Sequence, residues 1–298
     1  MVKTAWVFPG QGSQAVGMGA DLVPLPIAQS KFEQAEQILG WSVPDLCQSL
    51  DDKVSNTLYT QPCLYVVESI LADLLLAQGH QPALVAGHSL GEYVALYVAG
   101  VFDFAAGLQL VKRRAELMAA ASDGMMAALI GFDRPQLEQV IQDTADVVLA
   151  NDNNAGQVVI SGTPPAVEAV LAQVKAKRAV RLNVSGAFHS PLMAEAATQF
   201  HQVLEAVPFQ EARMPVLSNV EPKPTTAGVA LKDRLVRQMT GSVRWREISE
   251  QLPLEGIERV VEIGPGKVLT GLIKRTCPTL ELVNLSSYNE LVQAGKND

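Results

Sequence analysis

A serine between two glycines is the residue best placed for nucleophilic chemistry. Positions 87–91 read Gly-His-Ser-Leu-Gly, a G-x-S-x-G pattern with an apolar stretch before it and an apolar helical pattern after it. A sharp strand-to-helix turn lifts the serine hydroxyl clear of the backbone, and the flanking glycines remove Cβ atoms that would clash. Free N–H groups at the start of the next helix can stabilise a developing oxyanion. Ser89 is therefore the candidate nucleophile, against the alternative of a serine in an ordinary glycine turn.

A nucleophilic serine needs a base, and the chain has four histidines. His80 lies in a Gly-His-Gln-Pro connection, His88 would point away from its neighbour Ser89, and His201 falls beside the apolar stripe of its helix. His189 stands in a loop after a predicted strand, where catalytic residues collect. Elimination selects His189, although a lone histidine can also be structural. The chain order of an ordinary α/β-hydrolase does not fit, because no histidine occurs late in the chain.

Two polar residues fall on the apolar sides of their predicted helices. In the helix over 104–121, a rotation of about 100° per residue places Arg114 between Leu110 and Met118. A buried guanidinium needs an anion and hydrogen-bond acceptors. Arg114 therefore predicts either an internal pair with Asp or Glu or a clamp for a substrate carboxylate. Gln238 lies on the apolar face of its own helix in the same way.

Two glycine-rich loops raise the alternative of a bound cofactor. Gly10-Gln-Gly12-Ser-Gln-Ala15 follows an apolar strand and formally fits a dinucleotide pattern, but the acidic residue expected at a second strand is missing. Gly264-Pro-Gly266-Lys267 lacks the earlier glycine and the Ser/Thr of a P-loop, which favours a structural loop. The three cysteines are scattered, so no zinc site is expected. We expect neither a bound cofactor nor a metal.

An α/β fold is expected from strands that alternate with helices around these residues. Apolar strands at 4–8, 84–86, 215–220 and 258–264 are each followed by a turn or helical pattern, which favours a mostly parallel sheet. Residues 125–185 read βαββαβ, the ferredoxin-like order, with a helix over 163–177 and a last strand over 179–185. We expect a large hydrolase-like domain of residues 1–124 and 189–298, interrupted by a small inserted domain of residues 125–188.

Composition limits the class of protein. The 298 residues carry 23 Lys plus Arg against 31 Asp plus Glu, a net charge of −8, which argues against a broad nucleic-acid surface. Charged residues such as Glu68 and Asp73 interrupt every apolar run before the ~20 residues that cross a bilayer, and the N-terminus lacks a secretory signal. The unpaired cysteine pattern fits a reducing compartment. These features predict a soluble cytoplasmic protein, and the absence of coiled-coil or repeat patterns favours a monomer.

Taken together, these segments resemble the malonyl-CoA:acyl carrier protein transacylases of type II fatty acid synthesis. The resemblance runs through nearly the whole chain, and its specificity comes from an ordered set of motifs rather than from one. The matching segments are FPGQGSQ at 8–14, Gln61-Pro62, GHSLGEY at 87–93, LVKRRAELM at 110–118, NDNNAGQVVISG at 151–162, GAFHS at 186–190, LVRQ at 235–238 and EIGPGKVLTGL at 262–272.

The resemblance implies a role for each matching site residue. Ser89 would be the nucleophile and His189 its base, oriented by backbone carbonyls without a required carboxylate. The backbone N–H groups of Gln11 and Leu90 would form the oxyanion hole, and Arg114 would hold the malonyl carboxylate. The remaining matches would be Gln238 near the histidine, Asn153 as a support of the site, and Phe188 as the bulky residue that disfavours a 2-methyl group.

The implied reaction is a ping-pong transfer. A malonyl group would pass from malonyl-CoA to Ser89 and then to the phosphopantetheine thiol of acyl carrier protein, supplying fatty acid elongation. A trans-acting acyltransferase of a polyketide pathway would look the same in sequence. A serine thioesterase or hydrolase would use the same Ser89 and His189 with water as acceptor, and a catalytically idle module would only bind the carrier protein.

Docking of an acidic carrier protein to this acidic chain requires a local basic patch. The densest cluster of basic residues comprises Lys175, Lys177, Arg178 and Arg181. We expect Lys177 and Arg178 to help receive the carrier protein. The alternative is a solvated helix end whose positive charge is favoured by the helix dipole.

Overall fold

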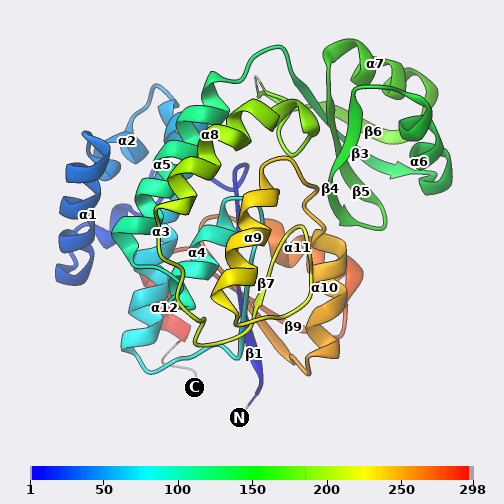
Figure 1. Ribbon diagram of the computed structural model, residues 1–298. Helices are drawn as coiled ribbons and strands as arrows, with labels where there is room; N and C mark the ends of the chain where they lie inside the picture. The colour runs from blue at the N-terminus through cyan, green and yellow to red at the C-terminus, as the bar shows by residue number, and fades with distance from the viewer. Residues whose placement is uncertain (1, 185, 295–298) are drawn as a thin grey trace.

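The computed structural model describes residues 2–184 and 186–294 and contains two separate sheets (Figure 1). The first sheet has five parallel strands in the order β7-β2-β1-β8-β9. Its strands are β1 (Thr4–Phe8), β2 (Leu84–Gly87), β7 (Val216–Leu217), β8 (Arg259–Ile263) and β9 (Glu281–Leu285). The strands are short and apolar, as expected for a parallel sheet covered on both faces. The predicted α/β class is confirmed.

Helices cover both faces of the first sheet because side chains alternate along each strand. Trp6 and Phe8 of β1 pack into a core shared with α3 and α5, whereas Ala5 and Val7 pack on the opposite side against α10 and α11. On the first side lie α1 (Pro26–Leu39), α2 (Val43–Gln48), α3 (Thr57–Ala77), α4 (Gly91–Val98), α5 (Phe104–Ala120), α8 (Ala194–Glu205) and α9 (Gly228–Gln238). The other side carries α10 (Trp245–Leu254) and α11 (Val268–Thr276), while α12 (Tyr288–Ala294) follows β9.

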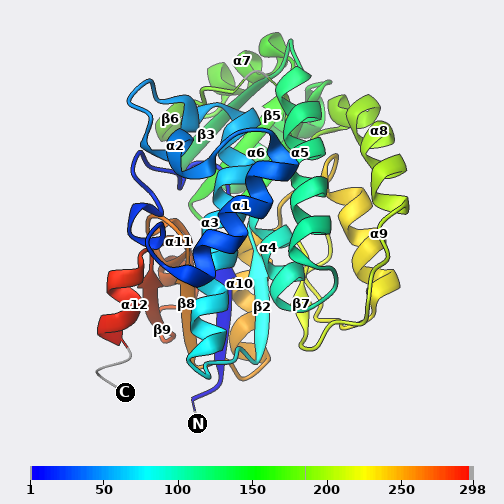
Figure 2. The same cartoon turned by 90° about the vertical axis from the view of Figure 1, so that its left-hand side faces the viewer.

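Helix α3 is the exception to the expectation that no segment could cross a bilayer. It has 21 residues and is apolar enough by length and composition to do so. In the fold, however, it is a core helix: it packs against α1, α4 and α5, and most of its side chains are buried (Figure 2). Even Glu68, which was expected to interrupt the apolar run, is buried within it.

The second sheet is antiparallel, in the order β4-β5-β3-β6. It consists of β3 (Met125–Phe132), β4 (Val147–Asn154), β5 (Gln157–Gly162) and β6 (Ala176–Arg181), with α6 (Arg134–Asp143) and α7 (Pro164–Gln173) packed on one face. The chain order is βαββαβ, as predicted. In both views this part of the chain lies at the end of the molecule toward which β1 runs (Figures 1 and 2), and Figure 1 shows α6 and α7 on its outer side.

The predicted boundaries of the last helix and last strand in this part of the chain are wrong. The helix expected over 163–177 ends at Gln173, and β6 already begins at Ala176. Lys177 and Arg178 are therefore exposed residues of an edge strand, so the alternative of a solvated helix end does not hold. Arg178 pairs in register with Ile130 of β3. The strand predicted over 179–185 ends at Arg181, and its last expected residue, Ser185, lies outside the described residues.

Candidate active site

Ser89 stands on a sharp turn between β2 and α4. Its φ of 52° lies in the left-handed region, which costs a non-glycine residue about 1–3 kcal/mol unless its surroundings hold it there. Asn219 does so: the Ser89 N–H donates to Asn219 Oδ1 at 2.7 Å, and Asn219 Nδ2 donates to the Gly87 carbonyl at 2.6 Å. A Cβ on Gly91 would lie 2.0 Å from the Phe8 carbonyl oxygen, so only glycine allows the turn to pack on β1.

The serine hydroxyl faces a neutral imidazole. Ser89 Oγ lies 2.8 Å from His189 Nε2, and His189 Nδ1 lies 3.0 Å from the backbone carbonyl of Gln238. Because a carbonyl only accepts, Nδ1 carries the proton and Nε2 is free to accept from the serine. Burial, together with the positive charge of Arg114, lowers the pKa of His189 to about 3. The pair can therefore begin a nucleophilic attack without first losing a proton to solvent.

Arg114 lies buried beside the same hydroxyl. Its Nη1 donates to Gln61 Oε1 at 2.6 Å, and its Nη2 donates to Ser89 Oγ at 3.0 Å and to Gln238 Oε1 at 3.1 Å. Among the described residues no carboxylate lies within ion-pair distance of the guanidinium, so the alternative of a direct internal salt bridge is wrong. Burial lowers the pKa of Arg114, and nearby Tyr93 and Glu92 oppose that shift. The neutral partners leave a positive charge next to the nucleophile without an anion in contact.

Gln238 connects the elements of the site. Its side-chain Nε2 donates to the Ser89 carbonyl at 2.9 Å and to Glu92 Oε2 at 2.7 Å. Its Oε1 accepts from Arg114, while its backbone carbonyl orients His189. The residue is fully buried at the end of α9, as its position on the apolar face predicted.

A small cavity of about 90 Å³ opens at the serine hydroxyl. The residues that line it are Gln11, His88, Ser89, Leu90, Arg114, Met118, Met126, Asn151, Leu182, Val184, Phe188 and His189. Within the described chain, the backbone N–H groups of Gln11 and Leu90 donate to no protein acceptor. Both residues border the cavity, so donors are available where an oxyanion would form. Phe188 is buried in the cavity wall.

The other predicted residues take different places. Asn153 is buried behind the cavity, where its Oδ1 accepts from His88 Nε2 at 2.9 Å. His201 contacts Glu205 on the exposed face of α8, as expected for a solvated histidine. Lys177 and Arg178 do not line the cavity.

Neither glycine-rich loop is shaped as a nucleotide site. A Cβ on Gly10 would lie 2.4 Å from the His88 carbonyl oxygen, so this glycine serves the packing of its loop on the serine turn. After the second loop, the buried carboxylate of Glu262 accepts from the N–H groups of Leu269 and Thr270 at 2.8 and 2.7 Å. This carboxylate occupies the helix N-terminus where a phosphate would bind.

Comparison with known proteins agrees with this geometry. The profile of the acyl transferase domain matches residues 5–292. The chain belongs to this acyltransferase family. It is 62% identical to the malonyl CoA-acyl carrier protein transacylase of Synechocystis sp. over 290 residues, which are 97% of this chain and 99% of the relative.

Two solved structures are similar to this chain over nearly its whole length. The crystal structure of malonyl-CoA:ACP transacylase from Synechocystis sp. PCC 6803 has a TM-score of 0.96 and 62% identity, covering 98% of this chain and 99% of that one. The malonyl-transacylase solved in complex with its type II PKS acyl-carrier protein has a TM-score of 0.93 and 38% identity, covering 99% and 100%.

Three polar residues of the acyltransferase site were not predicted to have a role: Gln61, Glu92 and Asn219. Gln61 and Glu92 are fully buried polar residues in the apolar helices α3 and α4. The test that singled out Arg114, a polar residue on an apolar helix face, would have found both. Asn219 follows a two-residue strand, where no periodicity exists to mark it.

Proposed function

We propose that this chain transfers a malonyl group from malonyl-CoA to the phosphopantetheine thiol of acyl carrier protein through a malonyl-Ser89 intermediate. The observation that carries the proposal is the buried guanidinium of Arg114, whose Nη2 lies 3.0 Å from Ser89 Oγ with no carboxylate of residues 2–184 or 186–294 in contact. An acyl group with its own distal carboxylate supplies the missing anion. The names of the related enzymes support the same substrate.

In the first half-reaction the substrate carboxylate pairs with Arg114 and its thioester carbonyl lies over Ser89. His189 Nε2 takes the hydroxyl proton as Oγ forms its bond to the carbonyl carbon. The N–H groups of Gln11 and Leu90 stabilise the oxyanion of the tetrahedral intermediate. The C–S bond then breaks, and protonated His189 returns its proton to the departing thiolate of coenzyme A.

The second half-reaction reverses these steps with a new thiol. His189 takes the proton of the phosphopantetheine thiol as its sulfur attacks the malonyl ester carbon. The bond from that carbon to Ser89 Oγ then breaks, and His189 returns the proton to Oγ. The cycle uses only the side chains and backbone N–H groups of the chain and needs no cofactor. The neutral imidazole at rest supports this role, because it accepts a proton in either direction.

Replacing Arg114 with alanine should reverse the choice of acyl group. We expect kcat/KM for malonyl-CoA loading to fall by about 100-fold, because the carboxylate loses a buried charged partner. Loading of acetyl-CoA should not fall, since acetyl-CoA leaves the wild-type guanidinium unpaired. Intact-mass measurements of both reactions check this, with Arg114→Lys as the matched variant that keeps the charge. An equal loss for both thioesters would contradict the assignment.

Phe188 supports malonyl over methylmalonyl. Its ring is buried in the wall of a cavity of about 90 Å³, where an added methyl group meets it. One methyl group discriminates by only about 10–200-fold in such a pocket.

We also propose that Lys177 and Arg178 help to dock the carrier protein. Both are exposed on β6, whereas the neighbouring Arg181 is engaged with Glu168 at 2.6 and 2.7 Å. Reversing both residues to glutamate should raise KM for the acidic carrier protein by about 10-fold and leave KM for malonyl-CoA unchanged. Lys3→Glu, just before β1, is the control for reversing an exposed positive charge elsewhere on the surface. Unaltered kinetics for both substrates in the double variant would refute the docking role.

We also propose a domain organisation, a cellular location and an oligomeric state for this enzyme. The topology of the second sheet supports a ferredoxin-like insertion of residues 125–188 in a hydrolase-like domain of residues 1–124 and 189–298. Three buried free thiols, Cys47, Cys63 and Cys277, support a reducing cytoplasmic location. We expect the enzyme to act as a monomer.

A pulse-chase experiment tests the proposed function. The protein is loaded with malonyl-CoA, freed of excess substrate and mixed with holo acyl carrier protein, and the masses of both proteins are followed. Passage of the malonyl group to the carrier protein supports the transferase, for either fatty acid or polyketide synthesis. Release of free malonate at the same rate with and without carrier protein would mean a hydrolase.

A further inference from the structure

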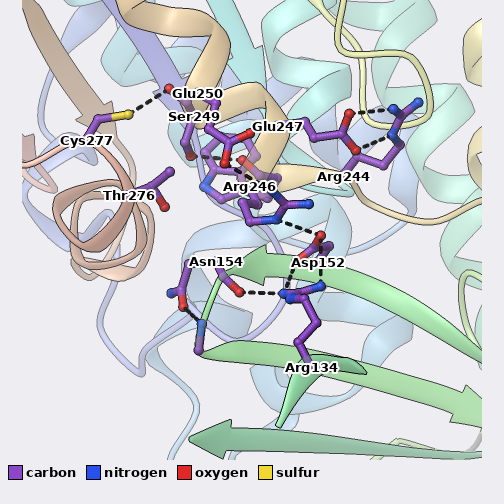
Figure 3. Close-up of polar contacts among 12 residues, drawn as sticks. Arg134, Asp152, Asn154, Arg244, Arg246, Glu247, Ser249, Glu250, Thr276 and Cys277 are labelled. Carbon is purple, nitrogen blue, oxygen red and sulfur yellow. Dashed lines mark hydrogen bonds and ion pairs between the residues drawn. The ribbon is translucent and has the colours of Figure 1, made fainter. Parts of the chain in front are cut away.

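A carboxylate behind the active-site cavity joins the two sheets of the molecule. Figure 3 shows Asp152 of β4 between Arg134, at the start of α6, and Arg246 in α10. Arg134 Nη2 lies 2.8 Å from Asp152 Oδ1, and Arg246 Nε lies 2.9 Å from Asp152 Oδ2. Arg134 belongs to the part of the chain that forms the second sheet, whereas α10 packs on the first sheet. Asp152 thus bridges the two.

These ion pairs are shielded from solvent. The side chain of Asp152 is 11% exposed, and those of Arg134 and Arg246 are 23% and 30% exposed. Partly buried pairs of this kind are screened less by salt than surface pairs. A backbone hydrogen bond joins the same two parts of the chain: the Asp152 N–H donates to the carbonyl of Val243, just before α10, at 2.9 Å.

The neighbours of Asp152 reach the active site. Asn151 and Asn153 flank Asp152 in β4 and make contacts other than those with the two arginines. Asn151 lines the cavity, and Asn153 accepts from His88, the residue before the nucleophile. The Oδ1 of Asn151 has no hydrogen-bond partner within the described chain, so that oxygen does not anchor the side chain and the strand decides its position.

The pairing of β4 with β5 does not hold this segment tightly by itself. The register shifts between Leu149 and Asn151 and again between Asp152 and Asn154. Such irregularities interrupt the ladder of hydrogen bonds and redirect side chains. The contacts of Asp152 therefore fall between two irregularities in the pairing of β4 with β5.

We propose that Asp152 is a positioning residue that sets the acyl selectivity of the cavity. Its pairs with Arg134 and Arg246 hold Asn151 as a cavity wall and Asn153 against His88. The inference rests on the proposed function, since it concerns which acyl group reaches Ser89. Without the carboxylate, Arg134 and Arg246 keep only their second ion-pair partners, Glu138 and Glu250, so these ion pairs no longer tie β4 to α10 and the strand can shift in the cavity wall.

The ratio of kcat/KM for loading malonyl-CoA to that for methylmalonyl-CoA tests this role. A wall that has moved admits the extra methyl group, so we expect Asp152→Asn to lower the ratio by about 10-fold. Asp152→Glu, which keeps the charge, should restore most of it. Glu250→Gln is the matched control, because Glu250 also pairs with Arg246, at 3.1 Å, but does not contact Asp152. A variant that is merely less stable loses active protein equally for both thioesters and leaves the ratio unchanged.

The selectivity of the Asp152 variants decides whether Asp152 has this positioning role. Wild-type selectivity in Asp152→Asn would overturn it, even if the variant unfolds at a lower temperature. If Asp152→Asn is insoluble, Arg246→Gln removes one of the two pairs and should lower the ratio in the same direction, and an unchanged ratio there would also overturn the role. Failure of the wild-type protein to load malonyl-CoA would instead refute the proposed function, and this inference with it.

Discussion

A Ser89→Ala variant should gain no mass when mixed with malonyl-CoA. Ser89 Oγ is the atom shared by His189 and Arg114, and a methyl group in its place leaves no nucleophile within reach of the imidazole. Loss of the nucleophile from a site of this type costs about 10⁴-fold or more in rate, because the remaining groups only bind and polarise the substrate. Intact-mass spectrometry and the rate of transfer to holo acyl carrier protein measure the effect.

A matched serine serves as the control for Ser89. Ser190 is also buried and adjoins His189, but its hydroxyl donates to the Ala187 carbonyl at 2.6 Å. Ser190→Ala should still form the malonyl adduct. Unaltered transfer by Ser89→Ala would exclude an acyl intermediate on Ser89. Absence of any adduct on the wild-type protein would instead favour the idle binding module.

Removal of the base should slow both half-reactions. We expect His189→Asn to lower the rate of malonyl loading by about 10³-fold, within the range that general-base catalysis supplies. Asparagine is the appropriate replacement because His189 has a φ of 57°, and asparagine tolerates this left-handed backbone better than alanine. The same loss should appear in the transfer to carrier protein, since one imidazole serves both steps. Loss of one half-reaction alone would contradict a shared base.

The low pKa of the buried base should make the activity of the wild-type enzyme independent of pH over the mildly acidic range. Only the neutral imidazole accepts a proton, and the pKa of His189 is lowered to about 3. The base form therefore persists as pH falls from 8 to 5, and kcat/KM for loading should stay flat over this interval. An imidazole with an ordinary pKa of about 6.5 would be only about 3% neutral at pH 5. An acidic limb near pH 6.5 would show that the site is more hydrated than its burial implies.

Local patterns sufficed to predict several residues that the fold brings together at the cavity. The G-x-S-x-G segment is continuous in the chain, so Ser89 and the strand-to-helix turn could be predicted without tertiary contacts. Arg114 and Gln238 stood out because helical periodicity fixes which side of a helix faces the core. The alternation of strands and helices predicted both the parallel sheet and the βαββαβ segment, since each pattern is set by near neighbours in the chain.

Where tertiary pairing competes with local preference, the local pattern was misleading. Residues 174–178 carry Lys, Ala and Arg, which favour helix, and the sequence predicted a helix as far as residue 177. Pairing with β3 instead draws this segment into β6. The length and apolar composition of α3 would suit a membrane span, and only its packing among α1, α4 and α5 makes it a core helix.

Sequence patterns alone suggested which side chains are proposed to do chemistry, whereas what each of them contacts depends on the tertiary structure. Arg114 required a partner, but periodicity left open an internal carboxylate or a substrate. The fold excluded the first by surrounding the guanidinium with Gln61, Ser89 and Gln238, which are 53, 25 and 124 residues away in the chain. The junction at Asp152 likewise brings together arginines 18 and 94 residues away. Contacts over such separations depend on how whole elements pack, and no short-range pattern records them.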